Sequence, residues 1–221
     1  NVRTFKVTQD VSFEEADSCK GSWQASAPGS AVAAGFACYL QKAIDVPVGI
    51  ILTCWGSSSI EGWMPLDMTE KLPHFKKEME VFKANDIDQV NAIKAKKKMT
   101  GKDNVFLRTR PNILYNKMMH PLIPFACRGI VWYQGEANTK SMESMVQYGK
   151  TLPMWVERYR REWGNEKLHF IPVMLPGFGR NFTKGTTLDD VDAQTWAWMR
   201  DSQLKILNLK NTAVANTIDL G

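Results

Sequence analysis

Two short stretches of the sequence place polar residues directly after runs that suit buried strands. In GIVWYQGEANT, residues 129–139, an apolar run leads into two carboxamides, Gln134 and Asn138. In CWGSSSIEGWMP, residues 54–65, Gly56 and three serines follow another apolar run. Parallel sheets have strands that are nearly continuous apolar runs, and they bind ligands just beyond the carboxyl ends of these strands. Both stretches therefore lie where a ligand-binding site is expected.

These residue types suit the stabilisation of a developing negative charge. If the two strands are neighbours, the backbone N–H of Gly56 and the carboxamide of Gln134 or Asn138 converge on one point. Acyl-transfer enzymes use convergent donors of this kind, and loss of one donor costs about 3 kcal/mol of transition-state stabilisation. The pair therefore predicts the oxyanion hole of an esterase. A plain tight turn, with Gly56 at positive φ and Ser57 as a cap, is the alternative interpretation of the second stretch.

The elements that position these residues follow from the hydrophobic periodicity. Apolar runs suited to strands recur along the chain, with helix-period segments between most of them. This alternation predicts right-handed βαβ crossovers and a mostly parallel sheet covered on both faces, which is an α/β fold. The predicted strands are Val2–Val7, Val46–Cys54, Gly129–Tyr133, Leu168–Leu175 and Thr212–Ile218, and the predicted helices are Val32–Ile44, Pro111–Leu122, Met142–Trp163 and Asp192–Leu207.

One charged segment, Leu66–Asn104, interrupts the alternation. Pro73 and Gly101 punctuate it as a helical excursion, and we expect it to shape the rim of a cleft. Much of the excess behind the net charge of +5 is lysine in this segment, where it is interleaved with acidic residues. No aromatic residues alternate with the lysines to stack on bases, so we expect a solvated face and no nucleic-acid partner. No apolar run approaches the roughly 20 residues that span a bilayer.

Several blocks of the sequence resemble the sialate O-acetylesterase family, a branch of the SGNH (GDSL-like) hydrolases. WYQGEAN and VPVGIILTCWGSSSIEGWMP are close to the family's usual WYQGESN and VPIGLINTSWGGTPIEAWM. The resemblance implies a flavodoxin-like three-layer sandwich, in one domain over residues 1–221 with a helical insertion at about 66–104. Further blocks agree in the family's order: RTFKV from Arg3, SAVAAGFACYLQKAI from Ser30, LYNKMMHPL from Leu114, WAWMRDSQLKIL from Trp196 and NTIDLG from Asn216.

The resemblance also implies an activity. It implies a secreted or periplasmic serine esterase without a cofactor that removes acetyl groups from hydroxyls of a sugar, with sialic acid as the first expectation. An acetyl-xylan esterase and a non-catalytic carbohydrate-binding relative are the alternatives. The residues carried over are Gly56 and Gln134 in the oxyanion hole, Ser57 where the family usually has a second glycine, and Glu136 and Asn138 in the same loop. Arg200 lies in a helix that resembles one whose arginine is expected to face the cleft, and a solvated helix face is the alternative explanation.

Two blocks of the family do not occur in residues 1–221. The family's nucleophile is the serine of a Gly-Gln-Ser-Asn block upstream of RTFKV, and its base is the histidine of an Asp-x-x-His-Pro block downstream of DLG. We therefore expect both catalytic residues to lie outside this chain, which is then incomplete at both ends. A self-contained triad of a serine from 57–59 with a histidine is the alternative. We expect the histidines to be surface or structural residues: His74, His120 and His169.

Glu136 follows Gly135 at the predicted end of a strand. We expect Trp132, Tyr133 and Trp55 to enclose its carboxylate, which would then support the loop and not serve as the acid of a triad. A buried carboxylate needs hydrogen-bond donors or a cationic partner, because its uncompensated burial costs several kcal/mol.

The sequence predicts no metal site. The cysteines have no CxxC spacing. Three aspartates, Asp189, Asp190 and Asp192, lie close together, but their spacing lacks the EF-hand pattern, and capping of a helix start explains them.

Overall fold

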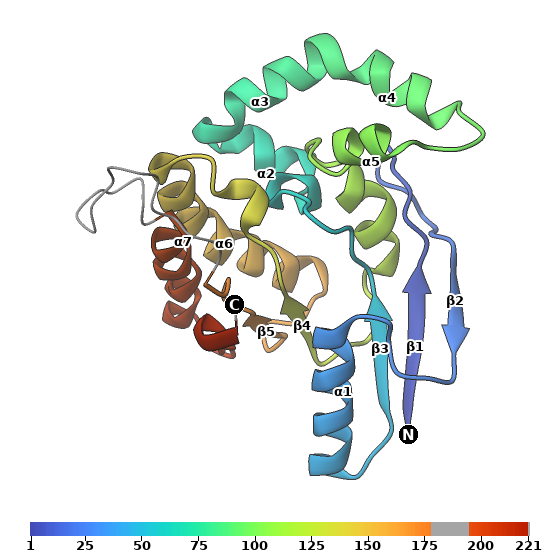
Figure 1. The fold of residues 1–221 in the computed structure, drawn as a ribbon, viewed down its shortest axis with the longest axis vertical. Coiled ribbons are helices and arrows are strands. Elements are labelled where there is room, and N and C mark those ends of the chain that lie inside the picture. Colours follow the sequence, from blue (N-terminus) through green and yellow to red (C-terminus); the bar gives the residue numbers. More distant parts are fainter. Residues whose placement is uncertain (178–194, 221) are drawn as a thin grey trace.

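The computed structural model describes residues 1–177 and 195–220 (Figure 1). Strand β1 (Val2–Val7) pairs in parallel with β3 (Val48–Leu52) and antiparallel with β2 (Gly21–Gln24). Strands β4 (Gly129–Trp132) and β5 (His169–Pro172) form a second, parallel pair. Helices connect and cover these strands, so the chain is a mixed α/β protein, as the alternation predicts.

The described strands form two small sheets, so the single, mostly parallel sheet stays a prediction. Within the described ranges β3 bonds to β1 and β4 bonds to β5, but no ladder joins β3 to β4. The edge strand β2 was not predicted, because its four residues are all exposed and form no apolar run. The strands that precede the two candidate stretches are thus both present, in separate sheets.

The predicted strand Thr212–Ile218 forms only isolated bridges, from Thr212 to Phe170 of β5 and from Ala215 to Val173 directly after β5. Its backbone nevertheless runs beside β5, since Ala213 N donates to Phe170 O over 3.1 Å and Ala215 N donates to Pro172 O over 2.9 Å. Proline has no N–H, so Pro172 cannot return a hydrogen bond to this segment. The ladder is interrupted at that residue.

The long helices form where the periodicity predicts them. Helices α1 (Ala31–Ile44) and α6 (Met142–Glu162) begin at serine caps, Ser30 and Ser141, whose side chains accept backbone N–H bonds. Helix α7 (Thr195–Leu204) matches the described part of the last predicted helix. The predicted helix Pro111–Leu122 contains a π-helical turn, Tyr115–Met119, and a 3₁₀ turn, His120–Leu122. No helix in the described part of the chain is long and apolar enough to cross a membrane.

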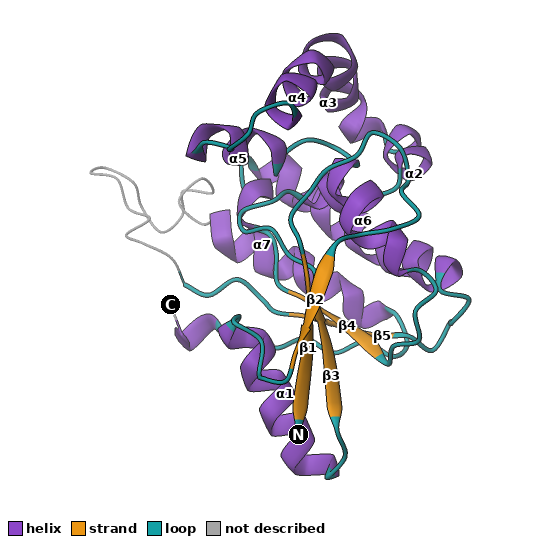
Figure 2. Ribbon diagram, turned by 90° about the vertical axis from the view of Figure 1, so that its right-hand side faces the viewer, coloured by secondary structure: helices purple, strands orange, loops and turns teal. Residues whose placement is uncertain are grey.

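The segment 66–104 is helical, as predicted, and lies beyond the carboxyl ends of β1 and β3 (Figures 1 and 2). It also contributes to the core, because Met68, Phe75, Phe82, Val90 and Ile93 are buried in the main apolar cluster. Its helices are α2 (Leu66–Lys71), α3 (Lys76–Val81), α4 (Ile87–Lys94) and α5 (Gly101–Leu107), the last continuing past the predicted boundary.

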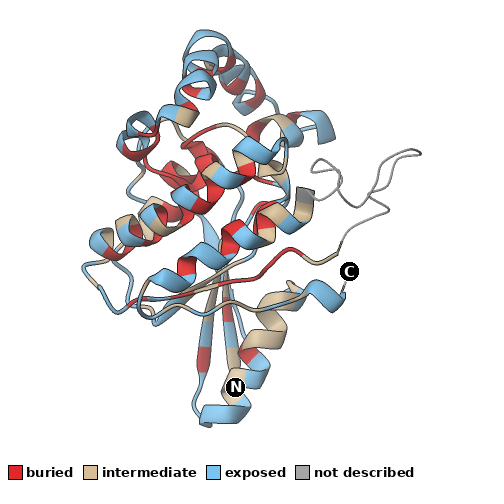
Figure 3. Cartoon of the chain, turned by 90° about the vertical axis from the view of Figure 1, so that its left-hand side faces the viewer, coloured by how far each residue is buried: buried red, intermediate tan, exposed pale blue. Residues whose placement is uncertain are grey.

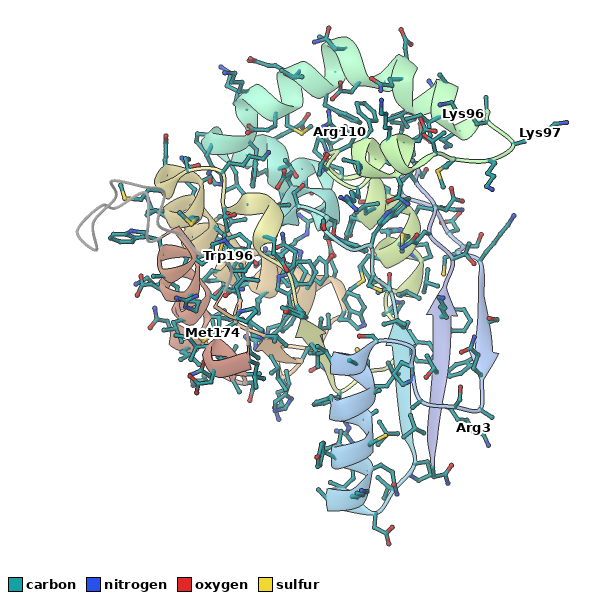
Figure 4. The ribbon with its side chains drawn as sticks, viewed as in Figure 1. Arg3, Lys96, Lys97, Arg110, Met174 and Trp196 are labelled. Carbon is teal, nitrogen blue, oxygen red and sulfur yellow. The ribbon has the colours of Figure 1, made fainter. Side chains whose placement is uncertain are left out.

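Lys96 and Lys97 of this segment lie in the loop between α4 and α5. Lys97 extends outward from the loop that follows α4 (Figure 4). Lys96 contacts Asp103 over 2.6 Å, and Arg110 pairs with Asp86 closer to the core. Lys96 and Arg110 are thus each paired with an acidic residue.

The core is an aromatic stack between α6 and the strands. Trp155 and Tyr159 of α6 are fully buried, and the ring centroids of this pair lie 4.2 Å apart. Both donate a hydrogen bond to the carbonyl of Trp63, over 3.0 Å and 2.7 Å. Figure 3 shows the buried residues concentrated along α6 and the segments packed against it. The core therefore holds the residue 60–63 turn firmly against α6.

Candidate functional site

The chain turns sharply after β3, within residues 54–58. Ser58 N donates to Trp55 O over 3.2 Å, and the residue in the left-handed conformation is Ser57, with φ 57°. The interpretation in which Gly56 supplies positive φ is therefore wrong. A side chain in the left-handed region costs roughly 1 kcal/mol, which explains why the resembling family places a second glycine there. Gly56 and Ser57 are both exposed, so their backbone is open to a ligand.

The next two serines are buried, and their hydroxyls contact no histidine. Trp63 Nε1 donates to Ser58 Oγ over 2.7 Å, whereas Ser59 Oγ is buried without a partner among the described residues. The three histidines have other surroundings: His74 contacts Thr151 Oγ1, His120 contacts Ala16 O and Glu15, and His169 is exposed. The described residues thus contain no self-contained Ser–His pair at residues 57–59.

Gln134, at the end of β4, lies inside the molecule with 5% of its surface exposed. Its Nε2 donates to Ser58 O over 2.9 Å and to Asn138 Oδ1 over 2.8 Å. Its Oε1 accepts from Tyr148 Oη over 3.0 Å. The two stretches singled out in the sequence are therefore joined directly, and both N–H groups of the Gln134 carboxamide already have acceptors.

Asn138 links Gln134 to a buried carboxylate. Its Oδ1 also accepts from Ile60 N over 3.0 Å, and its Nδ2 donates to Glu61 Oε2 over 3.0 Å. A carboxamide nitrogen carries two N–H groups. The second N–H of Asn138 has no partner within the described ranges, so it is the free side-chain donor of this network.

Two buried residues, Tyr148 and Gln203, and the half-buried Trp132 help to hold Gln134 in place. Trp132 Nε1 donates to Tyr148 Oη over 3.1 Å, and burial raises the pKa of that phenol, which keeps it a hydrogen-bond donor. Gln203 Nε2 donates to Gln134 O over 3.0 Å. A Cβ on Gly135 would approach Leu175 Cδ1 to 3.1 Å, so the chain needs a glycine where it passes β5 and α7.

Glu136 is exposed, and the prediction that aromatic residues enclose it is wrong. The 3₁₀ turn Glu136–Asn138 sends the Glu136 side chain outward while the Asn138 side chain reaches Glu61. Glu136 supports the loop through its backbone carbonyl, which accepts from Thr139 Oγ1 over 2.9 Å. The role of its carboxylate stays a prediction.

Arg200 lies on α7 but is not a member of this network. Its guanidinium donates to Pro176 O over 3.3 Å, and burial lowers the pKa of the group. The residue of α7 that reaches the site is Gln203, one turn further along. The role of Arg200 in binding stays a prediction.

A small pocket of about 50 Å³ opens beside Asn138 and Glu61. The 66–104 segment supplies one wall, through His74, Phe75 and Glu78. Residues of the segment thus line a pocket beside the candidate site, and its role as the rim of a substrate cleft stays a prediction.

Sequence reasoning missed Glu61, Tyr148 and Gln203 as members of the site. Glu61 offered a signal, since it is a single carboxylate within the apolar run IEGWM, and it is 4% exposed in the structure. Tyr148 and Gln203 offered none, because a tyrosine or glutamine on a helix is ordinary until the partner across the helix is known.

Within residues 1–177 and 195–220, no group of three or more His, Cys, Asp or Glu side chains could hold a metal ion. The cluster Asp189, Asp190 and Asp192 lies outside the described residues.

Known proteins resemble this chain in sequence and in fold. The sequence profile of the sialic acid-specific acetylesterases, a carbohydrate esterase family, matches residues 3–221. The chain therefore belongs to this carbohydrate esterase family.

Named relatives agree with this assignment. The human sialate O-acetylesterase is 26% identical over 196 residues, which cover 86% of this chain and 33% of the human protein. The mouse sialate O-acetylesterase is 27% identical and is likewise covered over 33% of its length. The chain thus spans about a third of the length of these relatives.

Two solved structures resemble the fold. A carbohydrate acetylesterase from Xanthomonas citri superposes with a TM-score of 0.71 at 28% identity, covering 100% of this chain and 43% of that one. An Arabidopsis thaliana protein, at 15% identity and a TM-score of 0.51 over 99% of this chain and 69% of that one, shows likeness in fold alone.

Proposed function

We propose that the protein to which this chain belongs is a carbohydrate O-acetylesterase that acts on O-acetylated sialic acid. A serine attacks the acetyl carbonyl, donors at the strand ends hold the tetrahedral intermediate, and water hydrolyses the acetyl-enzyme. The hydrogen-bonded network that joins Ser58, Gln134, Asn138 and Glu61 carries the proposal, because it brings together the two stretches expected to hold the oxyanion.

The donors divide into direct and supporting ones. We assign the direct contacts to the exposed backbone at Gly56 and Ser57 and to the second N–H of Asn138. Gln134, whose N–H groups are occupied, positions Asn138 and the turn at Ser58. Direct donation by Gln134, the role implied by the resemblance, requires it to release one of these acceptors when substrate binds.

The nucleophile and its base belong, in this proposal, to parts of the protein outside residues 1–221. The absence of a Ser–His pair at residues 57–59 in the described structure supports this assignment. The three-layer SGNH arrangement is part of the same proposal. A further parallel strand between β3 and β4 would bond to the edges that carry no ladder here and join the two sheets into one.

Two alternatives are distinguished by substrate. An acetyl-xylan esterase would release acetate from acetylated xylo-oligosaccharides faster than from O-acetylated sialic acid. A non-catalytic carbohydrate-binding relative would bind the deacetylated sugar and release no acetate. The expected secreted or periplasmic location stays a prediction.

Substitution of Asn138 in the full-length protein tests the assignment of the oxyanion donor. We expect Asn138→Ala to lower kcat on 4-nitrophenyl acetate about a hundredfold, since one oxyanion donor is worth about that factor. Gln134→Ala should lose activity and thermal stability together, because it also leaves Tyr148 and Ser58 O without their partner.

Asn91→Ala is the matched control, since Asn91 is exposed on α4. It should change neither kcat nor the thermal stability. Unchanged kcat in Asn138→Ala with a large loss in Gln134→Ala at full stability would reassign the donor to Gln134.

A further inference from the structure

The pocket beside the site has walls from two parts of the chain that are distant in sequence. Glu61, Asn138 and Tyr148 line it and also belong to the Gln134 network. His74 and Glu78, from the 66–104 segment, line it as well. At about 50 Å³ it has room for a few water molecules, and hence for one small polar group such as a hydroxymethyl.

The hydrogen bonds around His74 favour one tautomer. Thr151 Oγ1 lies 3.0 Å from Gln147 O and 2.8 Å from His74 Nε2, and when its proton is donated to Gln147 O it accepts from His74 Nε2. In this arrangement His74 carries its proton on Nε2. Burial lowers the pKa of the ring, so the ring is neutral at pH 7 and its Nδ1 is a hydrogen-bond acceptor.

Residues that line the pocket carry acceptors that have no hydrogen-bond partner within the described ranges. Besides Nδ1 of His74, these are Oε1 of Glu61 and the carboxylate of Glu78, while Asn138 Nδ2 donates only to Oε2 of Glu61. Acceptors without partners recognise donors, and a carboxylate accepts a hydroxyl proton about twice as strongly as a neutral oxygen does. A group that brings hydroxyls is thus the complementary ligand.

We propose that this pocket is a hydroxyl-binding subsite for the sugar, and that His74 and Glu78 are specificity-determining residues supplied by the helical insertion. The inference rests on the proposed esterase function. The pocket is lined by two carboxylates, those of Glu61 and Glu78, and by one lysine, Lys140. Its net negative charge repels a carboxylate of the substrate. The group it takes is therefore a neutral, hydroxyl-bearing part of the acetylated sugar, such as a polyol side chain.

Glu78→Gln in the full-length protein tests the subsite with little risk to the fold, because Glu78 is exposed and the change keeps its shape. Glu80→Gln is the matched control: Glu80 is exposed in the same helix, forms an ion pair with Lys76 and does not line the pocket. The kinetic substrates are 4-nitrophenyl acetate, which has no sugar, and an acetylated sugar, taken as O-acetylated sialic acid or acetylated xylo-oligosaccharide, whichever wild type hydrolyses faster.

We expect Glu78→Gln and His74→Gln each to lower kcat/KM on the acetylated sugar about tenfold, mainly by raising KM. Both should leave kcat/KM on 4-nitrophenyl acetate within about twofold of wild type. The subsite is wrong if the sugar reaction is unchanged, or if both substrates lose equally, since an equal loss indicates structural support.

A binding measurement separates this inference from the proposed function. Calorimetric titration with the deacetylated sugar should show about tenfold weaker binding to Glu78→Gln than to wild type or Glu80→Gln. If wild type released no acetate but kept this difference, the esterase proposal would fail and the subsite would stand. Equal affinity in all three proteins would overturn the subsite whatever the activity.

Discussion

At the scale of single residues, the site depends on a carboxylate other than the one most conspicuous in the sequence. Glu136 follows the strand directly but is exposed, whereas Glu61 is 4% exposed and accepts from Asn138. A hydrogen bond to a buried charged group contributes about 1.5–3 kcal/mol. Glu61 thus fixes the amide that we assign to the oxyanion.

We expect Glu61→Ala to lower the free energy of unfolding by about 1–3 kcal/mol, because Asn138 Nδ2 loses its acceptor in a buried setting. The same change should lower kcat about tenfold or more, because the Asn138 amide is then misplaced as a donor. A loss of about 1.4 kcal/mol of transition-state stabilisation corresponds to a tenfold lower rate. Denaturant unfolding and initial rates on the full-length protein measure the two effects.

Glu61→Gln, which retains an acceptor oxygen, should show smaller losses of both quantities. Glu136→Gln is the control and should stay within about 0.5 kcal/mol, as exposed substitutions usually do. A large loss in Glu136→Gln with none in Glu61→Gln would reverse these two assignments.

At the scale of elements, the crossing of α6 and α7 sets the position of Gln203. A Cβ on Gly149 of α6 would lie 3.0 Å from Ser202 Cβ and 3.1 Å from Ser202 Cα, so the two helices approach through a glycine. Gln203, the next residue on α7, donates to Gln134 O. The close crossing of α6 and α7 therefore affects the candidate site through the side chain of Gln203.

Gly149→Leu should lower stability by about 1–3 kcal/mol, because an overpacked contact forces backbone shifts. It should also lower kcat, since displacement of α7 moves Gln203 away from Gln134. Thermal unfolding and rates on 4-nitrophenyl acetate provide the measurement.

Gly35→Ala in α1 is the matched control, because nothing lies within 4 Å of its added Cβ. It should raise stability by up to about 1 kcal/mol through helix propensity alone. A gain of stability in both Gly149→Leu and Gly35→Ala would show that α7 can move away from α6 without cost. The crossing would then not fix the position of Gln203.

At the scale of the whole molecule, the residues that we assign to the oxyanion hole follow strands of two small sheets in the described part of the chain. The strands β3 and β4 that lead into it share no ladder among the described residues. The buried aromatic stack of α6 and the turn at 60–63 nevertheless connect the two halves. The halves are thus held together by side chains where a sheet would use backbone bonds.

A chain limited to residues 1–221 should hydrolyse 4-nitrophenyl acetate only at the background rate, because its described residues pair no serine of 57–59 with a histidine. Near-UV circular dichroism of the buried tryptophans serves as the control for folding. Robust turnover that disappears on substitution of Ser57, Ser58 or Ser59 would contradict both this expectation and the proposed mechanism.

The sequence by itself determined most of the elements and the part of the chain in which the candidate site lies. Apolar periodicity located β1, β3, β4, β5 and the long helices, because burial of a strand or of a helix face requires those repeats. Strand ends followed by Gly56 and Gln134 indicated the candidate site, since polar groups rarely follow a buried strand without a partner.

Only the tertiary structure decided which atoms meet. A single donor or acceptor in the sequence does not indicate its partner, so the pairing of Glu61 with Asn138, 77 residues apart, could not be read from spacing. The outward turn of Glu136 and the missing ladder between β3 and β4 depend likewise on backbone direction and on neighbours in space. The local sequence pattern indicates which residues require burial or a hydrogen-bond partner. Long-range packing determines which residue provides it.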